Sequence, residues 1–139
     1  MTEFVKELLK EYKDDISDNN FSRILYHCPP MLMQELMDVF SFANINVPTS
    51  SATTYADVCC YLLTIFSNIE LTNAKWSTGE SMFRFNVTGG ANVNYTNLRA
   101  HLYTMDCQLI KVDHDWVGRC SLTIKIFDKE LIRYNNLII

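Results

Sequence analysis

The apolar residues of this chain change from a helical to a mainly strand-like spacing near residue 70. Before that point they recur every three to four residues, which is the period of an amphipathic α-helix. After it they alternate, as in Phe83, Phe85 and Val87, which is the period of a β-strand with one face in solvent. Because the two patterns lie in separate segments, the sequence predicts an α+β fold and not a doubly wound parallel sheet.

Residues 1–69 carry the helical period, and we expect about four helices there. Apolar spacing predicts the first helix over residues 4–16. Asp18 or Asn19 can then cap a short second helix that runs through Tyr26, because their side-chain oxygens accept hydrogen bonds from the first helical amides.

Two consecutive prolines mark the next boundary. Pro29-Pro30 ends the second helix and begins a third one that runs to about residue 43, because proline fits a first helical turn. Residues 44–54 are polar enough to be a loop. The fourth helix, over residues 55–69, is apolar on nearly every face, so we expect it at the centre of the core.

The remaining residues, 70–139, carry the strand period, interrupted by one helical segment. The expected elements are strands over residues 71–77 and 82–87, a helix over 94–105, and strands over 107–112 and 120–127. We therefore expect one domain, residues 1–139, in which the N-terminal helices pack on a four-stranded, mostly antiparallel sheet in β-β-α-β-β order.

Charge and cysteine content limit the classes of partner. The chain has 12 basic and 16 acidic residues, a net charge of -4, and no basic face, so it is not expected to bind nucleic acid. No apolar run approaches the roughly 18 residues of a membrane span. Its five cysteines are an odd number without a repeating spacing, and its N-terminal segment is not a signal peptide. These features predict a small acidic cytoplasmic protein with reduced thiols.

Histidine and cysteine carry the most reactive side chains of the sequence. Thiolate and imidazole bind zinc, but His27-Cys28 and Cys59-Cys60 are adjacent pairs, and adjacent helical residues point about 100° apart. No signature of a Cys-His nucleophilic pair is present either. We therefore predict no metal, no cofactor and no catalytic residue. Buried cysteines that act as small apolar residues are expected at Cys28, Cys59 and Cys120.

The segment 88–91 (TGGA) lies between a predicted strand and a predicted helix. That position is typical of loops that hold a phosphate near a helix start. The segment lacks the lysine of a P-loop and the third glycine of a dinucleotide fingerprint, so a loop that needs positive φ is the alternative. If it binds a ligand, polar residues of the solvent-facing sheet surface are expected to contribute. The residues of this hypothetical site are Arg84, Gly89, Gly90, Arg99 and His101.

A second group of residues is typical of contact surfaces. One methionine lies off the buried stripe of its helix, a histidine and a tryptophan lie at the tip of the second hairpin, and an apolar tail ends the chain. The histidine, flanked by two aspartates, suits a pH-responsive or anion-contacting loop, with a plain polar turn as the alternative. The tail must dock somewhere, for example as an added edge strand. These residues are Met31, His114, Trp116, Leu137, Ile138 and Ile139.

The leading functional hypothesis is a non-enzymatic cytosolic protein that binds another protein, such as an inhibitor, immunity factor or adaptor, and forms a homodimer. The abundance of Asn, Ile and Tyr is typical of an AT-rich genome, so a phage or virus accessory protein fits. The alternative is a small-molecule or nucleotide-sensing domain that uses the Gly89-Gly90 loop and the sheet face. No nucleic-acid or membrane partner is expected.

Overall fold

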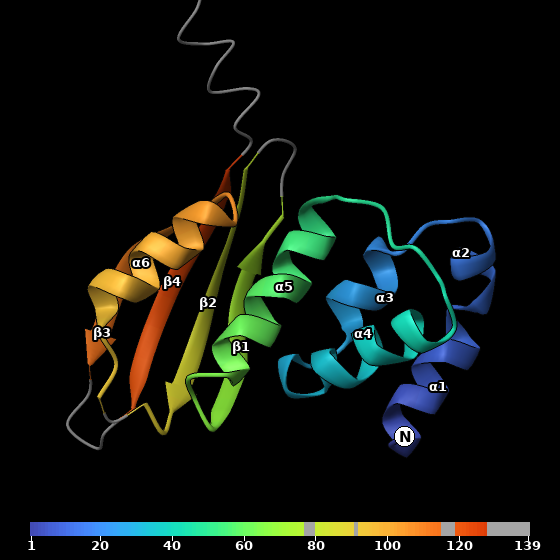
Figure 1. Cartoon of the computed structure of the whole chain (residues 1–139), viewed down its shortest axis with the longest axis horizontal. Helices are drawn as coiled ribbons and strands as arrows, with labels where there is room; N and C mark the ends of the chain where they lie inside the picture. The colour runs from blue at the N-terminus through green and yellow to red at the C-terminus, as the bar shows by residue number, and fades with distance from the viewer. Residues whose placement is uncertain (77–79, 91, 115–118, 128–139) are drawn as a thin grey trace, which may run out of the picture. The chain divides into compact units, whose positions relative to one another are not determined.

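The computed structural model describes residues 1–76, 80–90, 92–114 and 119–127. These residues form six α-helices, one 3-10 helix and four β-strands, and the chain divides into a helical unit, residues 1–64, and a sheet unit, residues 65–139 (Figure 1). The α+β class and the four-stranded antiparallel sheet are confirmed. That the helices pack on the sheet and share one core with it stays a prediction.

The helical unit begins with α1 (Glu3–Glu11), α2 (Lys13–Ser17) and α3 (Ser22–His27). The first two occupy the segment predicted as one helix, because Tyr12, with φ −103° and ψ 18°, leaves helical geometry between them. The apolar face still forms as expected, with Val5, Leu8 and Tyr12 buried. This break is one reason why the helices outnumber the predicted four.

The predicted caps of α3 are wrong. Phe21 occupies the N-cap position, and its side chain makes no capping hydrogen bond. Asn19 instead has φ 59°, in the left-handed region that asparagine tolerates better than most residues. Asn20 Oδ1 accepts a hydrogen bond from Ser22 N at 3.4 Å. The asparagines therefore shape the turn after α2.

The helical unit continues with η1 (Pro30–Leu32), α4 (Met33–Phe42) and α5 (Ser51–Leu63). The start of α5 comes earlier than the predicted residue 55, because Ser50 and Thr53 form a capping box: Ser50 Oγ accepts from Thr53 N at 3.3 Å, and Thr53 Oγ1 accepts from Ser50 N at 2.6 Å. It ends before the predicted residue 69, because the chain from Asn68 onward pairs as a strand.

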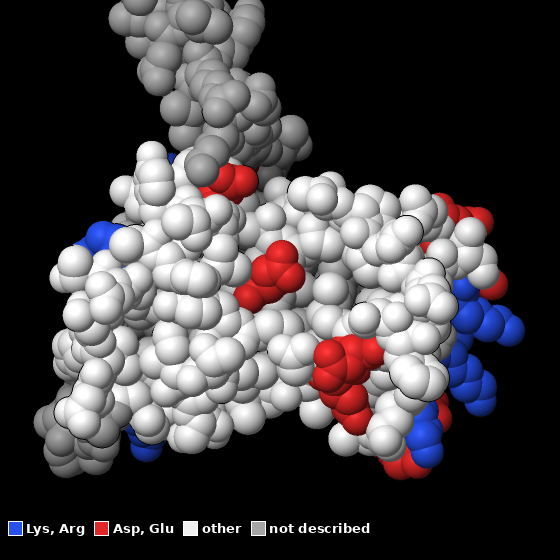
Figure 2. Space-filling view, viewed as in Figure 1, with Lys and Arg blue, Asp and Glu red and all other residues white. Residues whose placement is uncertain are grey.

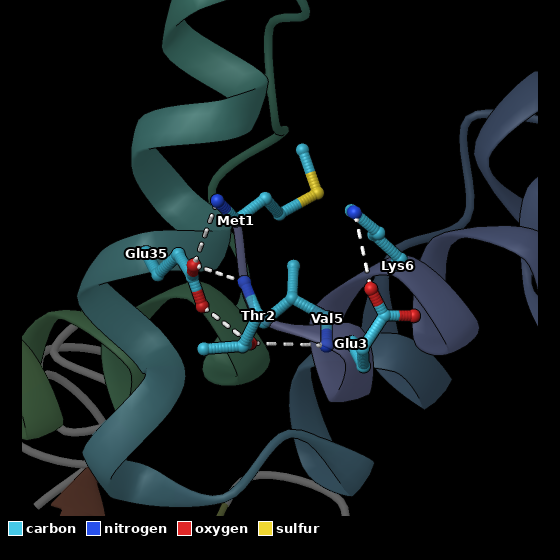
Figure 3. Close-up of polar contacts among 6 residues, drawn as sticks. All are labelled: Met1, Thr2, Glu3, Val5, Lys6 and Glu35. Carbon is cyan, nitrogen blue, oxygen red and sulfur yellow. Dashed lines mark hydrogen bonds and ion pairs between the residues drawn. The ribbon is translucent and has the colours of Figure 1, made fainter.

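Thr2 ties α1 to α4. Its hydroxyl accepts a hydrogen bond from Val5 N at 3.4 Å, which caps α1, and donates to Glu35 Oε2 at 2.8 Å, while Thr2 N donates to Glu35 Oε1 at 2.7 Å (Figure 3). The hydroxyl bond first, and then the backbone bond, hold the pKa of Glu35 below its ordinary value. The polar side chains at this end of the unit are thus used for structure.

Large apolar side chains fill the interior of the helical unit. Phe21 and Phe40 meet edge to face with ring centroids 5.3 Å apart. Burying one such side chain contributes about 1.5–3 kcal/mol. The largest fully buried residues here are Ile24, Leu25, Met33, Leu36, Phe40, Tyr55 and Leu62.

The sheet unit contains β1 (Asn68–Lys75), β2 (Glu80–Thr88), α6 (Tyr95–Thr104), β3 (Cys107–His114) and β4 (Cys120–Phe127). All neighbouring strands are antiparallel, and their order in space is β1-β2-β4-β3. The second strand of each hairpin therefore lies in the middle of the sheet, and α6 packs against β3. The two outer strands each carry an irregularity, between Leu71 and Asn73 and between Leu109 and Lys111.

The two faces of the sheet differ in polarity. Phe83, Phe85 and Val87 of β2 are buried and alternate with exposed residues, as the twofold period predicts. They lie beside Leu122 and Ile124 of β4, so one face is apolar across the two central strands. The opposite face is mostly polar, because the residues that alternate with this apolar set include Arg84 and Asn86 of β2 and Thr123 and Lys125 of β4.

Charged residues are few on the face shown in Figure 2, where basic and acidic side chains lie close together at the end that holds α1. Lys6 Nζ lies 3.1 Å from Glu3 Oε1 there, an exposed pair one helical turn apart. This agrees with a solvated helix face rather than a basic patch. Among the described residues, no helix has both the length and the apolar composition needed to cross a membrane.

Candidate functional site

A cavity of about 470 Å³ lies in the sheet unit, around the glycine loop that follows β2. Its walls come from the end of β2, the first turn of α6 and the adjoining ends of β3 and β4. This volume is within the range of about 300–1,000 Å³ that is usual for small-molecule sites. The lining residues are Phe66, Val87, Thr88, Gly89, Gly90, Val93, Tyr95, His114, Arg119 and Cys120.

Close packing of the main chain explains the two glycines. Gly89 has φ 85°, a conformation that residues with a side chain rarely adopt, so the predicted need for positive φ is confirmed there. A Cβ at Gly89 would collide with the side chain of Ser67, which also holds the loop, since Ser67 N and Oγ donate to Thr88 O at 3.0 and 3.3 Å. A Cβ at Gly90 would collide with the ring of Phe66 and with Val93.

The start of α6 is already capped. Asn94 Oδ1 accepts hydrogen bonds from Thr96 N at 3.0 Å and Asn97 N at 3.2 Å. Two of the amides that a phosphate would use at a helix start are therefore occupied by the helix's own cap. A ligand in this cavity would be held mainly by side chains and by the glycine loop.

Tyr95, the first residue of α6, links three elements around the cavity. Its hydroxyl donates to Cys120 Sγ on β4 at 3.5 Å, and its ring meets that of His114 on β3 edge to face, with centroids 5.4 Å apart. Burial first, and then the hydrogen bond with Cys120, raise the pKa of Tyr95 to about 12. The phenol is therefore neutral near pH 7 and can act as a hydrogen-bond donor.

The cavity wall includes one guanidinium and one imidazole. His114 ends β3 and Arg119 precedes β4, and both side chains are exposed. None of the ten described lining residues is acidic. Asp113 pairs instead with Lys111, whose Nζ lies 3.5 Å from Asp113 Oδ2. A small anion would meet a guanidinium, an imidazole and a phenol here without a carboxylate in the described wall.

The five residues of the hypothetical ligand site do not come together. Gly89 and Gly90 line the cavity. Arg84 lies on the polar face of the sheet, where its Nε donates to Ser121 Oγ at 2.6 Å. The alternation that buries its two phenylalanine neighbours turns it to that face. Arg99 lines a separate hollow of about 350 Å³. His101 is exposed on α6 and lines neither of these two hollows.

Of the residues expected at contact surfaces, the structure describes Met31 and His114. Met31 is 43% exposed in η1. His114 belongs to the cavity wall. Trp116 and the tail residues Leu137, Ile138 and Ile139 lie outside the described residues.

Tyr95 and Arg119 were missed by the sequence reasoning. The end of β2, the end of β3 and the start of β4 meet at one end of an antiparallel sheet. The registers of the two hairpins alone do not place Arg119 near the glycine loop, because that grouping also requires β4 to pair with β2.

Most of the cysteines are buried. All five lie in the described part of the chain and form no disulfide, and Cys28, Cys59 and Cys120 are buried as expected. Burial raises the pKa of Cys28 to about 12 and that of Cys60 to about 11, so these thiols stay protonated near pH 7. Within the described ranges, no group of three or more His, Cys, Asp or Glu residues could hold a metal ion.

Comparisons with protein-family models, with curated proteins and with solved structures find no match to this chain. Function must therefore be inferred from the residues around the cavity.

Proposed function

We propose that this chain is a non-enzymatic binding protein whose sheet unit takes a nucleotide or a similar small anionic ligand in the glycine-lined cavity. The observation that carries the proposal is the convergence of Tyr95, His114 and Arg119 on one cavity whose ten described lining residues include no carboxylate. Unlike the hypothetical site drawn from the sequence, this set of polar groups belongs to a single cavity.

The chemistry of the wall suits a phosphate attached to a ring. Arginine recognises phosphate oxygens with paired N–H donors, which gives both charge and geometry. The Tyr95 ring borders the cavity while its hydroxyl proton is donated to Cys120, and the glycine loop lets main chain approach the ligand closely. The rings of Phe66 and Tyr95 offer apolar surface for a base.

Binding rather than catalysis is proposed because the wall offers no activated nucleophile. The thiol of Cys120 is buried and accepts the hydrogen bond of Tyr95. We also propose that the chain works in a reducing cytosol, where unpaired cysteines are common.

Isothermal titration with ribonucleoside monophosphates and with inorganic phosphate tests the proposal. The wild type should bind, and Arg119→Gln should raise the dissociation constant about tenfold or more, because a charge-assisted hydrogen bond is lost. Arg99→Gln is the matched control, since Arg99 lines a different hollow. Absence of binding by the wild type, or equal losses in the two variants, would reject the cavity as the site.

Protein binding is the second candidate function, with an inhibitor, immunity factor or adaptor as the kind of protein. It is supported by Phe42, which is 93% exposed at the end of α4. Phe40 and Ile45, on either side of Phe42 in the chain, help to line a hollow of about 540 Å³. Exposed aromatic rings are frequent anchors of protein interfaces. Phe42→Ser should abolish capture of a protein partner from the native host while leaving nucleotide binding unchanged.

A further inference from the structure

The outer strand β3 has an open edge. The spatial order β1-β2-β4-β3 gives each outer strand one neighbour, and within the described ranges no strand pairs with the far side of β3. Such an edge presents unpaired N–H and C=O groups that can pair with another strand. Ile110, at the irregularity of β3, is 44% exposed, whereas β1 has no large exposed apolar residue. The β3 edge is therefore the less protected of the two.

The charges of β3 are self-complementary in one antiparallel register. Val112 lies between Lys111 and Asp113, which both point to the polar face because they pair with Thr123 and Ser121. If Val112 meets Val112 of a second copy, each Lys111 lies opposite an Asp113 of the other copy. Opposite charges at directly facing positions stabilise a strand pair, and like charges destabilise it.

Shifting the axis by one residue loses this match. An axis at Lys111 places two lysines opposite each other, and an axis at Asp113 places two aspartates opposite each other. Both shifts therefore put like charges in contact. Of these three, the axis at Val112 is the one that gives attractive pairs without a like-charge contact.

We propose that two copies of this chain associate through antiparallel pairing of their β3 strands, with the twofold axis at Val112. The two sheets then form one continuous sheet, and an isologous contact of this kind closes as a dimer. The pairing covers only residues 110–114 of each copy. We therefore expect it to bury less surface than the about 1,200–2,000 Å² of a standard interface. The dimer is therefore weak and depends on protein concentration.

This contact adjoins the cavity but does not rest on the proposed function. In the pairing, His114 of one copy lies opposite Ile110 of the other, and the His114 side chain also lines the cavity. A ligand that orders His114 would raise the affinity of the two copies for each other, and dimerisation would raise the affinity for the ligand by the same factor. Dimerisation can be measured without any ligand, so the failure of one proposal is distinguishable from the failure of the other.

Sedimentation equilibrium over a wide range of concentration tests the dimer. The wild type should associate, and Asp113→Lys should raise the dimer dissociation constant about tenfold, because both cross-strand pairs become repulsive. The double variant Lys111→Asp/Asp113→Lys restores opposite charges and should return the constant close to the wild-type value. Glu70→Lys, a charge reversal on the other outer strand, should have no effect.

Two results would overturn the proposal. A wild type that stays monomeric at every concentration would show that the β3 edge does not mediate self-association. A dimer that withstands Asp113→Lys, with the variant shown to be folded by circular dichroism, uses a different surface.

Discussion

The helical unit and the sheet unit use their polar side chains differently. In the helical unit, Thr2 caps α1 and bonds to Glu35 of α4 (Figure 3). Ser50 and Thr53 bond to each other's backbone and cap α5. In the sheet unit, Tyr95, His114 and Arg119 come from separate elements and face one cavity. The polar groups of the first unit thus join neighbouring segments, whereas those of the second converge on one cavity.

The largest effects should come from the two interiors. Leu36→Ala in the helical unit should lower the free energy of unfolding by about 2–5 kcal/mol, and Phe85→Ala in the sheet unit by about 3–5 kcal/mol, as measured by urea denaturation. Only Phe85→Ala should also weaken nucleotide binding under conditions where both variants are folded, because β2 ends in the glycine loop. An equal loss of affinity in Leu36→Ala would contradict the claim that only the sheet unit binds the ligand.

A matched pair of smaller changes separates stability from binding. Gly89→Ala should cost about 1–2 kcal/mol of unfolding free energy, because φ is 85° and the added Cβ meets Ser67. Ser50→Ala removes the cap of α5 and should cost about 1 kcal/mol. Titration calorimetry should find weaker nucleotide binding in Gly89→Ala alone. Similar affinities in both variants would mean that the loop is purely structural.

The smallest effect concerns the pH dependence of the Thr2–Glu35 contact. The pKa of Glu35 is lowered in the folded chain, so the contact stabilises the fold above the ordinary glutamate pKa of about 4.5 and is lost as the pH falls through the lowered value. Glu35→Gln should therefore be less stable than the wild type near neutral pH, and the difference should vanish in acid. Thermal melts across this range check it, and a difference that grows in acid would contradict the assigned sign.

The sequence predicts local elements well and long-range neighbours poorly. Strand β2 was found because its buried residues alternate strictly, and α6 because its apolar residues keep a helical spacing. The end of α5 was misplaced because Ile65, Phe66 and Ile69 continue the three-to-four-residue spacing of the helix. The start of α5 was misplaced because Ser50, Thr53 and Thr54 are all suitable N-cap residues, and the local sequence does not select one of them.

The candidate site shows the same limit. Gly89 and Gly90 were recognised from their place between a strand and a helix. The alternation of Arg84 with two buried phenylalanines placed it correctly on the polar face, but it could not show that the residues lining the cavity do not include it. Arg119 could not be joined to the glycine loop without knowing that β4 pairs with β2, a contact between strands more than 30 residues apart.

A titration followed by heteronuclear NMR tests the central claim most directly. Adding a ribonucleoside monophosphate to the labelled chain should shift the amide signals of Gly89, Gly90, Tyr95, His114 and Arg119, and leave those of residues 1–64 nearly unchanged. Shifts confined to residues 1–64, or none at any ligand concentration, would contradict the assignment of binding to the sheet unit.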